Sequence, residues 1–205
     1  SLLKIANRTK LRKTAKISKP DKECIERFAN EMADVFGKRY SVFSYRQKNK
    51  PESYQTLWQV SMYDEDIFDF LSINTDNKKS IPEYFFSASP EVQREIVKGL
   101  MDSDGHITKQ KGGVDAVVWH IGFSNTSKSM VEGFARILQQ NGVIVGKLSE
   151  LNKSGYRTCY MLNVNKKTFY EKGFCFYSER KQGRFVDCVN QLYASETLHA
   201  ESVKD

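Results

Sequence analysis

The stretch that decides the fold of this sequence is VKGLMDSDG, residues 97–105. It closes a segment with helical spacing of apolar residues, for which Ser89 is a suitable N-cap and Pro90 a suitable first residue. Gly105 is predicted to end the helix with a positive φ. Asp104 then stands at the C-terminal end, where the helix dipole does not stabilise a carboxylate and a cation is favoured.

The same helix carries two small residues, Gly99 and Ser103, one turn apart. Residues four positions apart lie on one face of a helix. Small side chains on that face allow a second helix to approach closely. The segment is therefore predicted to pack against another helix along this face.

Two parts of the sequence resemble each other, which indicates an internal repeat. The segment IERFA at residues 25–29 corresponds to VEGFA at residues 131–135. Further along, the corresponding residues are Tyr54, Thr56 and Val60 with Tyr156, Thr158 and Leu162. Because the matches occur in the same order, the sequence predicts two structural repeats.

Each repeat has the same predicted order: a basic strand region, a helix, two strands and a short helix. The predicted helices span 21–36 and 127–141, the strand pairs 39–46 with 55–63 and 143–150 with 156–164, and the closing helices 64–71 and 166–173. This order predicts an α+β fold. The predicted domains are a first repeat at 1–86, a second repeat at 87–190 with the helix 90–105, and a polar tail at 191–205.

The positive charge of the chain is concentrated at its start. The formal net charge is +7, which alone is weak evidence for a nucleic-acid partner. Residues 1–20 contain Lys and Arg, no acidic residue, and several apolar residues. We expect a strand pair with an apolar face and a cationic face suited to a polyanion, and a disordered basic arm is the alternative.

Membrane and disulfide classes are not favoured. No apolar run approaches the ~18 residues of a membrane span, and residues 1–16 lack the apolar core of a secretory signal. The cysteines form no CxxC pair and are predicted to be free thiols in a reducing compartment; they are Cys24, Cys159, Cys175 and Cys188. The sequence thus predicts an intracellular protein.

Residues 97–105 resemble the nine-residue LAGLIDADG motif. The identical positions are Gly99, Leu100, Asp102, Asp104 and Gly105, with mild replacements at Val97, Met101 and Ser103 and a departure at Lys98. Residues 79–85 are also similar to the segment that leads into this helix in the family. Over roughly residues 1–190, the chain resembles a two-repeat LAGLIDADG homing endonuclease whose first motif is not seen in this sequence.

This resemblance implies two pseudo-symmetric αββαββα-type repeats whose saddle-shaped antiparallel sheets lie in the DNA major groove. It implies site-specific hydrolysis of double-stranded DNA with Mg²⁺ or Mn²⁺, ions that take a few carboxylates together with water and phosphate. Asp104 and the neighbouring Ser103 would bind the metal, and Asp104, Lys79 and Lys181 would be catalytic. A helix cap is the alternative for Asp104, and an ordinary solvated lysine is the alternative for Lys79 and Lys181.

Groove contacts are expected from outward-facing strand positions, because Arg and Lys can hold phosphates or read guanine edges. The candidates in the first repeat are Arg8, Lys10, Arg12, Arg39 and Arg46. The candidates in the second repeat are His106, Lys109, His120, Lys147 and Arg157.

The resemblance also raises the question of the first motif. Counting back from Gly105 by the spacing of the repeats places that motif just before Ser1. We therefore expect the chain to be truncated, processed or completed by a second polypeptide that supplies the motif. A homodimer that pairs two Asp104 helices is the alternative.

Other functions remain open on the same scaffold. One is an RNA-binding maturase for a group I intron, and another is a non-catalytic DNA-binding protein. Splicing as an intein is not favoured, because the sequence lacks an N-terminal splicing block and a His-Asn end. If the chain derives from an intein, it corresponds to the endonuclease insert.

Overall fold

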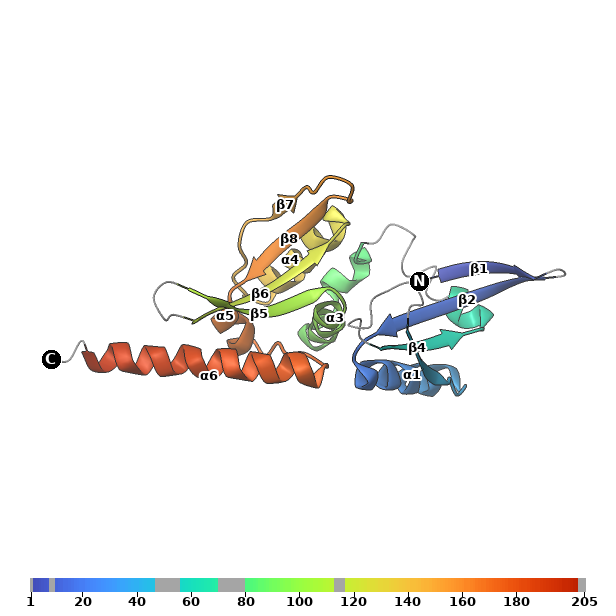
Figure 1. Cartoon of the computed structure of the whole chain (residues 1–205), viewed down its shortest axis with the longest axis horizontal. Helices are drawn as coiled ribbons and strands as arrows, with labels where there is room; N and C mark the ends of the chain where they lie inside the picture. Colours follow the sequence, from blue (N-terminus) through green and yellow to red (C-terminus); the bar gives the residue numbers. More distant parts are fainter. Residues whose placement is uncertain (1, 8–9, 47–55, 70–79, 113–116, 203–205) are drawn as a thin grey trace. The chain divides into compact units, whose positions relative to one another are not determined.

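The computed structural model describes residues 2–7, 10–46, 56–69, 80–112 and 117–202, with side chains described for 14–46, 56–69, 80–112 and 117–194 (Figure 1). Two compact units divide the chain at Asn77 and Lys78. The sequence placed this boundary at residue 86. The boundary lies earlier because Ile81, Phe85 and Phe86 belong to the hydrophobic core of the second unit.

The first unit is a four-stranded antiparallel sheet, in the order β1-β2-β4-β3, with α1 against one face. Its elements are β1 (Leu2–Asn7), β2 (Lys10–Lys19), α1 (Lys22–Phe36), β3 (Val42–Tyr45) and β4 (Leu57–Met62). The helix buries Ile25, Ala29 and Met32 in a core shared with Val60 and Met62 of β4. The apolar spacing along α1 therefore determines which face of the sheet is covered.

The second unit contains a sheet in the order β5-β6-β8-β7. Its elements are η1 (Glu83–Ser87), α3 (Pro90–Ser103), β5 (Gly105–Lys111), β6 (Val117–Asn125), α4 (Lys128–Gln140), β7 (Ser149–Leu151), β8 (Cys159–Val164), α5 (Lys166–Glu171) and α6 (Glu179–Ser202). In both units the first strand pairs with the second, the second with the fourth and the fourth with the third. The predicted α+β fold with two repeats of antiparallel sheet is confirmed.

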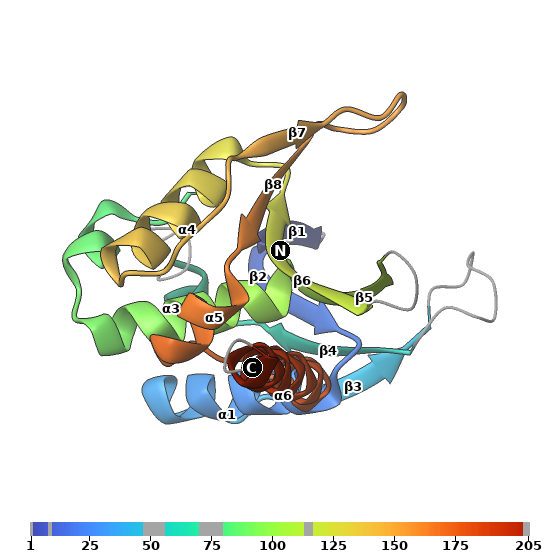
Figure 2. The same cartoon turned by 90° about the vertical axis from the view of Figure 1, so that its left-hand side faces the viewer.

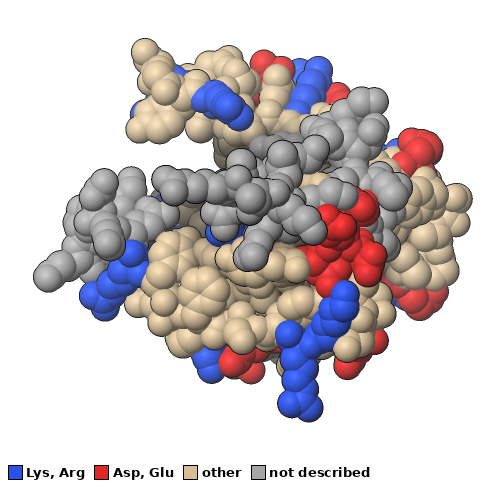
Figure 3. Space-filling view, turned by 90° about the vertical axis from the view of Figure 1, so that its right-hand side faces the viewer, with Lys and Arg blue, Asp and Glu red and all other residues tan. Residues whose placement is uncertain are grey.

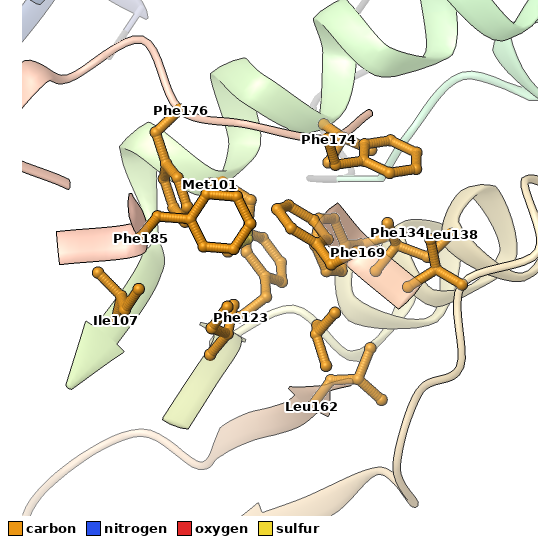
Figure 4. Close-up of a cluster of buried hydrophobic side chains, with 14 of the residues drawn as sticks. Met101, Ile107, Phe123, Phe134, Leu138, Leu162, Phe169, Phe174, Phe176 and Phe185 are labelled. Carbon is orange, nitrogen blue, oxygen red and sulfur yellow. The ribbon is translucent and has the colours of Figure 1, made fainter. Parts of the chain in front are cut away.

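The core of the second unit lies under its sheet and is rich in phenylalanine (Figure 4). Phe123 of β6 stacks on Phe134 of α4 with ring centroids 4.4 Å apart, and both rings are fully buried. Phe169 of α5 meets Phe185 of α6 edge-on at 5.6 Å. Met101 of α3 is also fully buried in this cluster. Burial of each such side chain contributes about 1.5–3 kcal/mol, so α3 is anchored to the sheet.

The last helix differs from the predicted polar tail at 191–205. Helix α6 continues to Ser202, and Figure 2 shows it nearly end-on. Trp119 Nε1 donates to Gln191 Oε1 at 2.9 Å, and Gln191 Nε2 donates to the carbonyl of Val117 at 3.1 Å. Tyr193 packs against the core. The helix persists past residue 190 because these contacts attach it to β6.

Strand β7 is shorter than the predicted strand 143–150. Val145 forms an isolated bridge with Val164, and the Gly146 amide donates to the carbonyl of Asn163 at 2.8 Å. Residues 145 and 146 therefore make isolated backbone contacts with β8, and regular strand pairing begins only at Ser149.

Helix α3 begins as predicted, with the amide of Val92 donating to Ser89 Oγ and Pro90 at the first position. Its end differs, because Gly105 does not have a positive φ. Glycine is required there by crowding: a Cβ on Gly105 would lie 2.5 Å from the carbonyl oxygen of Met101. No helix in the described part of the chain is long and apolar enough to cross a membrane.

Candidate functional site

Asp104 is the residue that ends α3, and its carboxylate is exposed. Its amide donates to the carbonyl of Leu100 at 3.0 Å, and its own carbonyl accepts from the amide of Ser124 at 3.3 Å. One carboxylate oxygen, Oδ2, accepts a hydrogen bond from Asn125 Nδ2 at 2.8 Å. The acid is thus held by its backbone and by one oxygen at the junction of α3 with the sheet.

Asn125 was not predicted from the sequence. It is the last residue of β6, and its Oδ1 accepts from the amide of Ser127 at 2.8 Å just before α4. The side chain is therefore fixed at both ends, between the start of α4 and Asp104. A partial signal was available: Asn125 lies just before the predicted helix at 127–141, and the pairing of β6 with β5, the strand after the motif, brings it close to Asp104.

Asp102 is hydrogen-bonded to the backbone that precedes α6. Its carboxylate accepts from the amides of Tyr177 at 2.8 Å and Ser178 at 3.1 Å. These two residues immediately precede α6, so Asp102 binds the start of that helix. A negative charge is favourable at this end of a helix.

Lys181 lies in the first turn of α6 and is only 8% exposed. Its ammonium donates to the carbonyls of Met101 at 2.7 Å, Asp102 at 2.9 Å and Gly105 at 2.8 Å. The resemblance implied a catalytic role for this lysine. In the structure its ammonium is directed at the backbone at the end of α3. Lys79, the other predicted catalytic lysine, lies outside the described residues.

Ser103, the second predicted metal ligand, donates its hydroxyl to the carbonyl of Leu100 at 2.9 Å. The described residues contain no group of three or more His, Cys, Asp or Glu side chains that could hold a metal ion. Mg²⁺ is commonly bound through one or two carboxylates together with water and phosphate oxygens. The exposed carboxylate of Asp104 fits that kind of site, in which water and phosphate oxygens would supply the remaining ligands.

The outward face of the second sheet has no Lys, Arg, Asp or Glu among its described positions. Successive side chains of a strand point to opposite faces, and the buried Ile107, Trp119 and Ile121 mark the covered face. The opposite positions on β5, β6, β7 and β8 are His106, Thr108, Gln110, Val118, His120, Gly122, Ser124, Ser149, Leu151, Cys159, Met161 and Asn163. These described positions contain no Lys, Arg, Asp or Glu.

Lys109 alternates onto the covered face, contrary to its predicted outward direction. Its ammonium lies 5.5 Å from the centroid of the Trp119 ring. His106 and His120 do lie on the outward face. Burial, followed by the charges of Lys181 and His120, lowers the pKa of His106. A Cβ on Gly122 would meet the His106 ring at 2.7 Å, so this glycine makes room for the imidazole.

The other residues predicted to contact the DNA groove are Lys147 and Arg157 in the second unit and Arg8, Lys10, Arg12, Arg39 and Arg46 in the first. Lys147 precedes β7, and Arg157 lies between β7 and β8; both are exposed. In the first unit, Arg39 and Arg46 are exposed. Lys10 and Arg12 are in β2, where their side chains are outside the described ones, and Arg8 lies outside the described residues altogether. On the face in Figure 3, Lys and Arg side chains are scattered among neutral and acidic groups.

The small residues Gly99 and Ser103 of α3 are one turn apart. Gly99 is exposed, and a Cβ placed there would meet no described atom within 4 Å. Val92 on the same side is 44% exposed. The side of α3 opposite to Val97 and Met101 is therefore exposed.

Residues 91–172 match a family model described as LAGLIDADG-like domain. The fold is also similar to that of the homing endonuclease I-DmoI in complex with DNA and Mn, with a TM-score of 0.55 and 13% identity over 83% of this chain and 84% of that chain. The meganuclease I-SmaMI bound to uncleavable DNA gives a TM-score of 0.53 and 10% identity over 97% of this chain and 88% of that chain. At such identities the likeness concerns the fold.

Two curated proteins of Methanocaldococcus jannaschii are similar in sequence. One is named "Probable translation initiation factor IF-2" and is 25% identical over 182 residues, 80% of this chain. The other is an uncharacterized protein, 24% identical over 140 residues, 68% of this chain. The chain spans about 15% of the length of each of these relatives. The domain match and the shared architecture together establish that this chain carries a LAGLIDADG-like domain and has the fold of the LAGLIDADG homing endonucleases.

Proposed function

We propose that this protein is a site-specific endonuclease that hydrolyses double-stranded DNA with a divalent metal ion, and that Asp104 is its metal-binding acid. The observation that carries the proposal is the exposed carboxylate at the end of α3, inside the LAGLIDADG-like domain. Asn125 donates to Oδ2 of this carboxylate at 2.8 Å, and in the proposed site Oδ1 would bind the metal ion.

A divalent ion such as Mg²⁺ or Mn²⁺, when bound by Asp104 and DNA phosphate, would stabilise charge on the reacting oxygens and promote attack by water. Asn125 orients the carboxylate through its hydrogen bond. The backbone hydrogen bonds of Asp104 with Leu100 and Ser124 hold residue 104 between α3 and β6. Lys79 is retained as a candidate catalytic lysine, because it lies outside the described residues.

The DNA would lie along the outward face of the sheets. Exposed basic residues outside the strands, Lys147 and Arg157, are suited to phosphates. The outward side chains of β5, β6 and β8, which include no Lys, Arg, Asp or Glu, would then face base edges rather than the backbone. Amide side chains such as Gln110 and Asn163 suit adenine, and apolar ones such as Met161 suit the thymine methyl group.

A second motif helix would complete the active site. A Cβ on Gly99 would meet no described atom within 4 Å, so this face of α3 would accept a closely packed helix, and a second acid would then come near Asp104. We propose that this helix belongs to another polypeptide or to a second copy of this chain.

The experiment is a binding selection with the purified chain, first without divalent metal and then with Mg²⁺. A randomised duplex DNA library and a pool of structured RNA compete in the same reaction. We expect enrichment of one long duplex site, cleavage of that duplex on addition of Mg²⁺, and affinity that falls steeply with salt. Enrichment of RNA alone would favour the maturase, and binding of duplex without cleavage in Mg²⁺ or Mn²⁺ would favour a non-catalytic DNA-binding protein.

A further inference from the structure

We propose that Lys181 and Asp102 form a reciprocal clamp between the end of α3 and the start of α6, and that Lys181 is a positioning residue for Asp104 rather than a phosphate contact. The inference takes only one point from the proposed function, which is that Asp104 binds the metal ion. The clamp itself is defined by hydrogen bonds within the second unit.

One half of the clamp is made by Lys181. A lysine ammonium has three protons to donate, and three backbone carbonyls accept them at 2.7–2.9 Å. Two of these carbonyls, of Met101 and Asp102, belong to the last turn of α3, where helix carbonyls lack partners within the helix. The third belongs to Gly105. The ammonium therefore bridges the backbone on both sides of Asp104.

The other half is made by Asp102, from α3 toward α6. Its carboxylate accepts the amides of Tyr177 and Ser178, which precede the first residue of α6. Ser178 also accepts the amide of Lys181 through its hydroxyl at 3.4 Å. Each helix end thus receives a side chain of the favourable charge from the other: an anion at the start of α6 and a cation at the end of α3.

The burial of Lys181 determines which role it can have in catalysis. Lys181 is 8% exposed and its three donors meet protein carbonyls, so the lysine holds the backbone that presents Asp104. A lysine that contacts phosphate would need its ammonium at the surface. Removal of Lys181 is therefore expected to loosen residue 104 without removing a contact with DNA.

The test compares Lys181→Met with Lys128→Met in the whole chain. Lys128 is an exposed lysine of α4, 3.8 Å from Glu132, and serves as the matched control. Hydrogen exchange of two amides reports on residue 104: its own, bonded to Leu100, and that of Ser124, bonded to its carbonyl. We expect both to exchange about tenfold faster or more in Lys181→Met and to be unchanged in Lys128→Met. Unchanged exchange in Lys181→Met would overturn the clamp.

Duplex binding separates positioning from phosphate contact. Removal of one phosphate contact weakens affinity and reduces the salt slope by about one. We expect Lys181→Met to keep the affinity and salt slope of the wild type while DNA incision falls; a reduced slope would overturn the positioning role. If the wild type neither binds nor incises duplex DNA, the proposed function fails, and the exchange measurement still decides whether the clamp exists.

A second variant covers the case in which Lys181→Met does not fold. Asp102→Asn keeps the size of the side chain and removes its charge at the start of α6. We expect faster exchange of the Tyr177 and Ser178 amides together with that of Asp104. Faster exchange at Tyr177 and Ser178 with no change at Asp104 would show that the two helix ends are not coupled, and would overturn the reciprocal clamp.

Discussion

Replacement of Gly105 by alanine tests how the end of α3 is built. A Cβ at this position would lie 2.5 Å from the carbonyl oxygen and 2.6 Å from the Cα of Met101. Both atoms belong to the backbone, so either α3 or β5 must move. Overpacking of this kind costs about 1–3 kcal/mol, and the stiffer unfolded chain offsets about 0.4–1 kcal/mol. We expect Gly105→Ala to lower the free energy of unfolding by about 1–2 kcal/mol.

Gly99→Ala in the same helix is the matched control. The Cβ there meets no described atom within 4 Å, and alanine favours a helix interior over glycine by about 0.5–1 kcal/mol. The two identical substitutions are therefore expected to change stability in opposite directions. The assay is urea unfolding followed by tryptophan fluorescence in a Trp58→Phe background. In that background the buried Trp119 reports on the second unit.

The reasoning would be refuted if Gly105→Ala were as stable as the wild type, because the crowding against Met101 would then be absorbed without cost. Destabilisation by Gly99→Ala in the monomeric chain would likewise contradict the open space beside that residue.

Three further predictions concern the core, the acid and pH. Phe134→Ala should lower the free energy of unfolding by about 3–5 kcal/mol, because it empties a fully buried ring position stacked on Phe123; Val186→Ala, at a position 46% exposed, should change it by less than about 0.5 kcal/mol in the same urea assay. Asn125→Ala should reduce DNA incision by about 10–100-fold with duplex affinity retained, as expected for a residue that orients a metal ligand; an unchanged incision rate would remove Asn125 from the site. Hydrogen bonding from Lys38 lowers the pKa of Asp64, so the folded state favours the ionised carboxylate. The stabilisation is therefore present at neutral pH and lost as pH falls below about 4. Unfolding measured against pH should show the difference between wild type and Asp64→Asn shrinking in that range, whereas a constant difference would contradict the ion pair.

Local signals made the central helix and the repeats predictable. Ser89 and Pro90 mark the start of α3 by short-range capping chemistry, and the apolar spacing of α1 and α4 depends only on neighbouring turns. The LAGLIDADG-like segment at 97–105 then indicated the fold, which the architecture confirmed. Each of these patterns lies within one element, so it can be recognised in the sequence without the tertiary structure.

The environment of the acid was less predictable, because it is made by residues far apart in the sequence. Lys181 reaches carbonyls of residues 101–105 across 76 to 80 positions, and its buried surroundings depend on how α6 docks. The direction of Lys109 could have been obtained by counting two residues from the apolar Ile107. Gly105 was assigned a positive φ by analogy with helix caps, whereas the actual requirement is a tertiary contact with Met101.

The most direct test of the account is DNA incision as a function of Mg²⁺ concentration, with the wild type and Asp104→Asn compared on the duplex enriched in the binding selection. We predict that incision by the wild type depends on Mg²⁺ and saturates, and that Asp104→Asn binds the same duplex with equal affinity and does not incise it. Incision by Asp104→Asn at the wild-type rate, or equal incision by the wild type with all divalent metal chelated, would contradict the role given to Asp104.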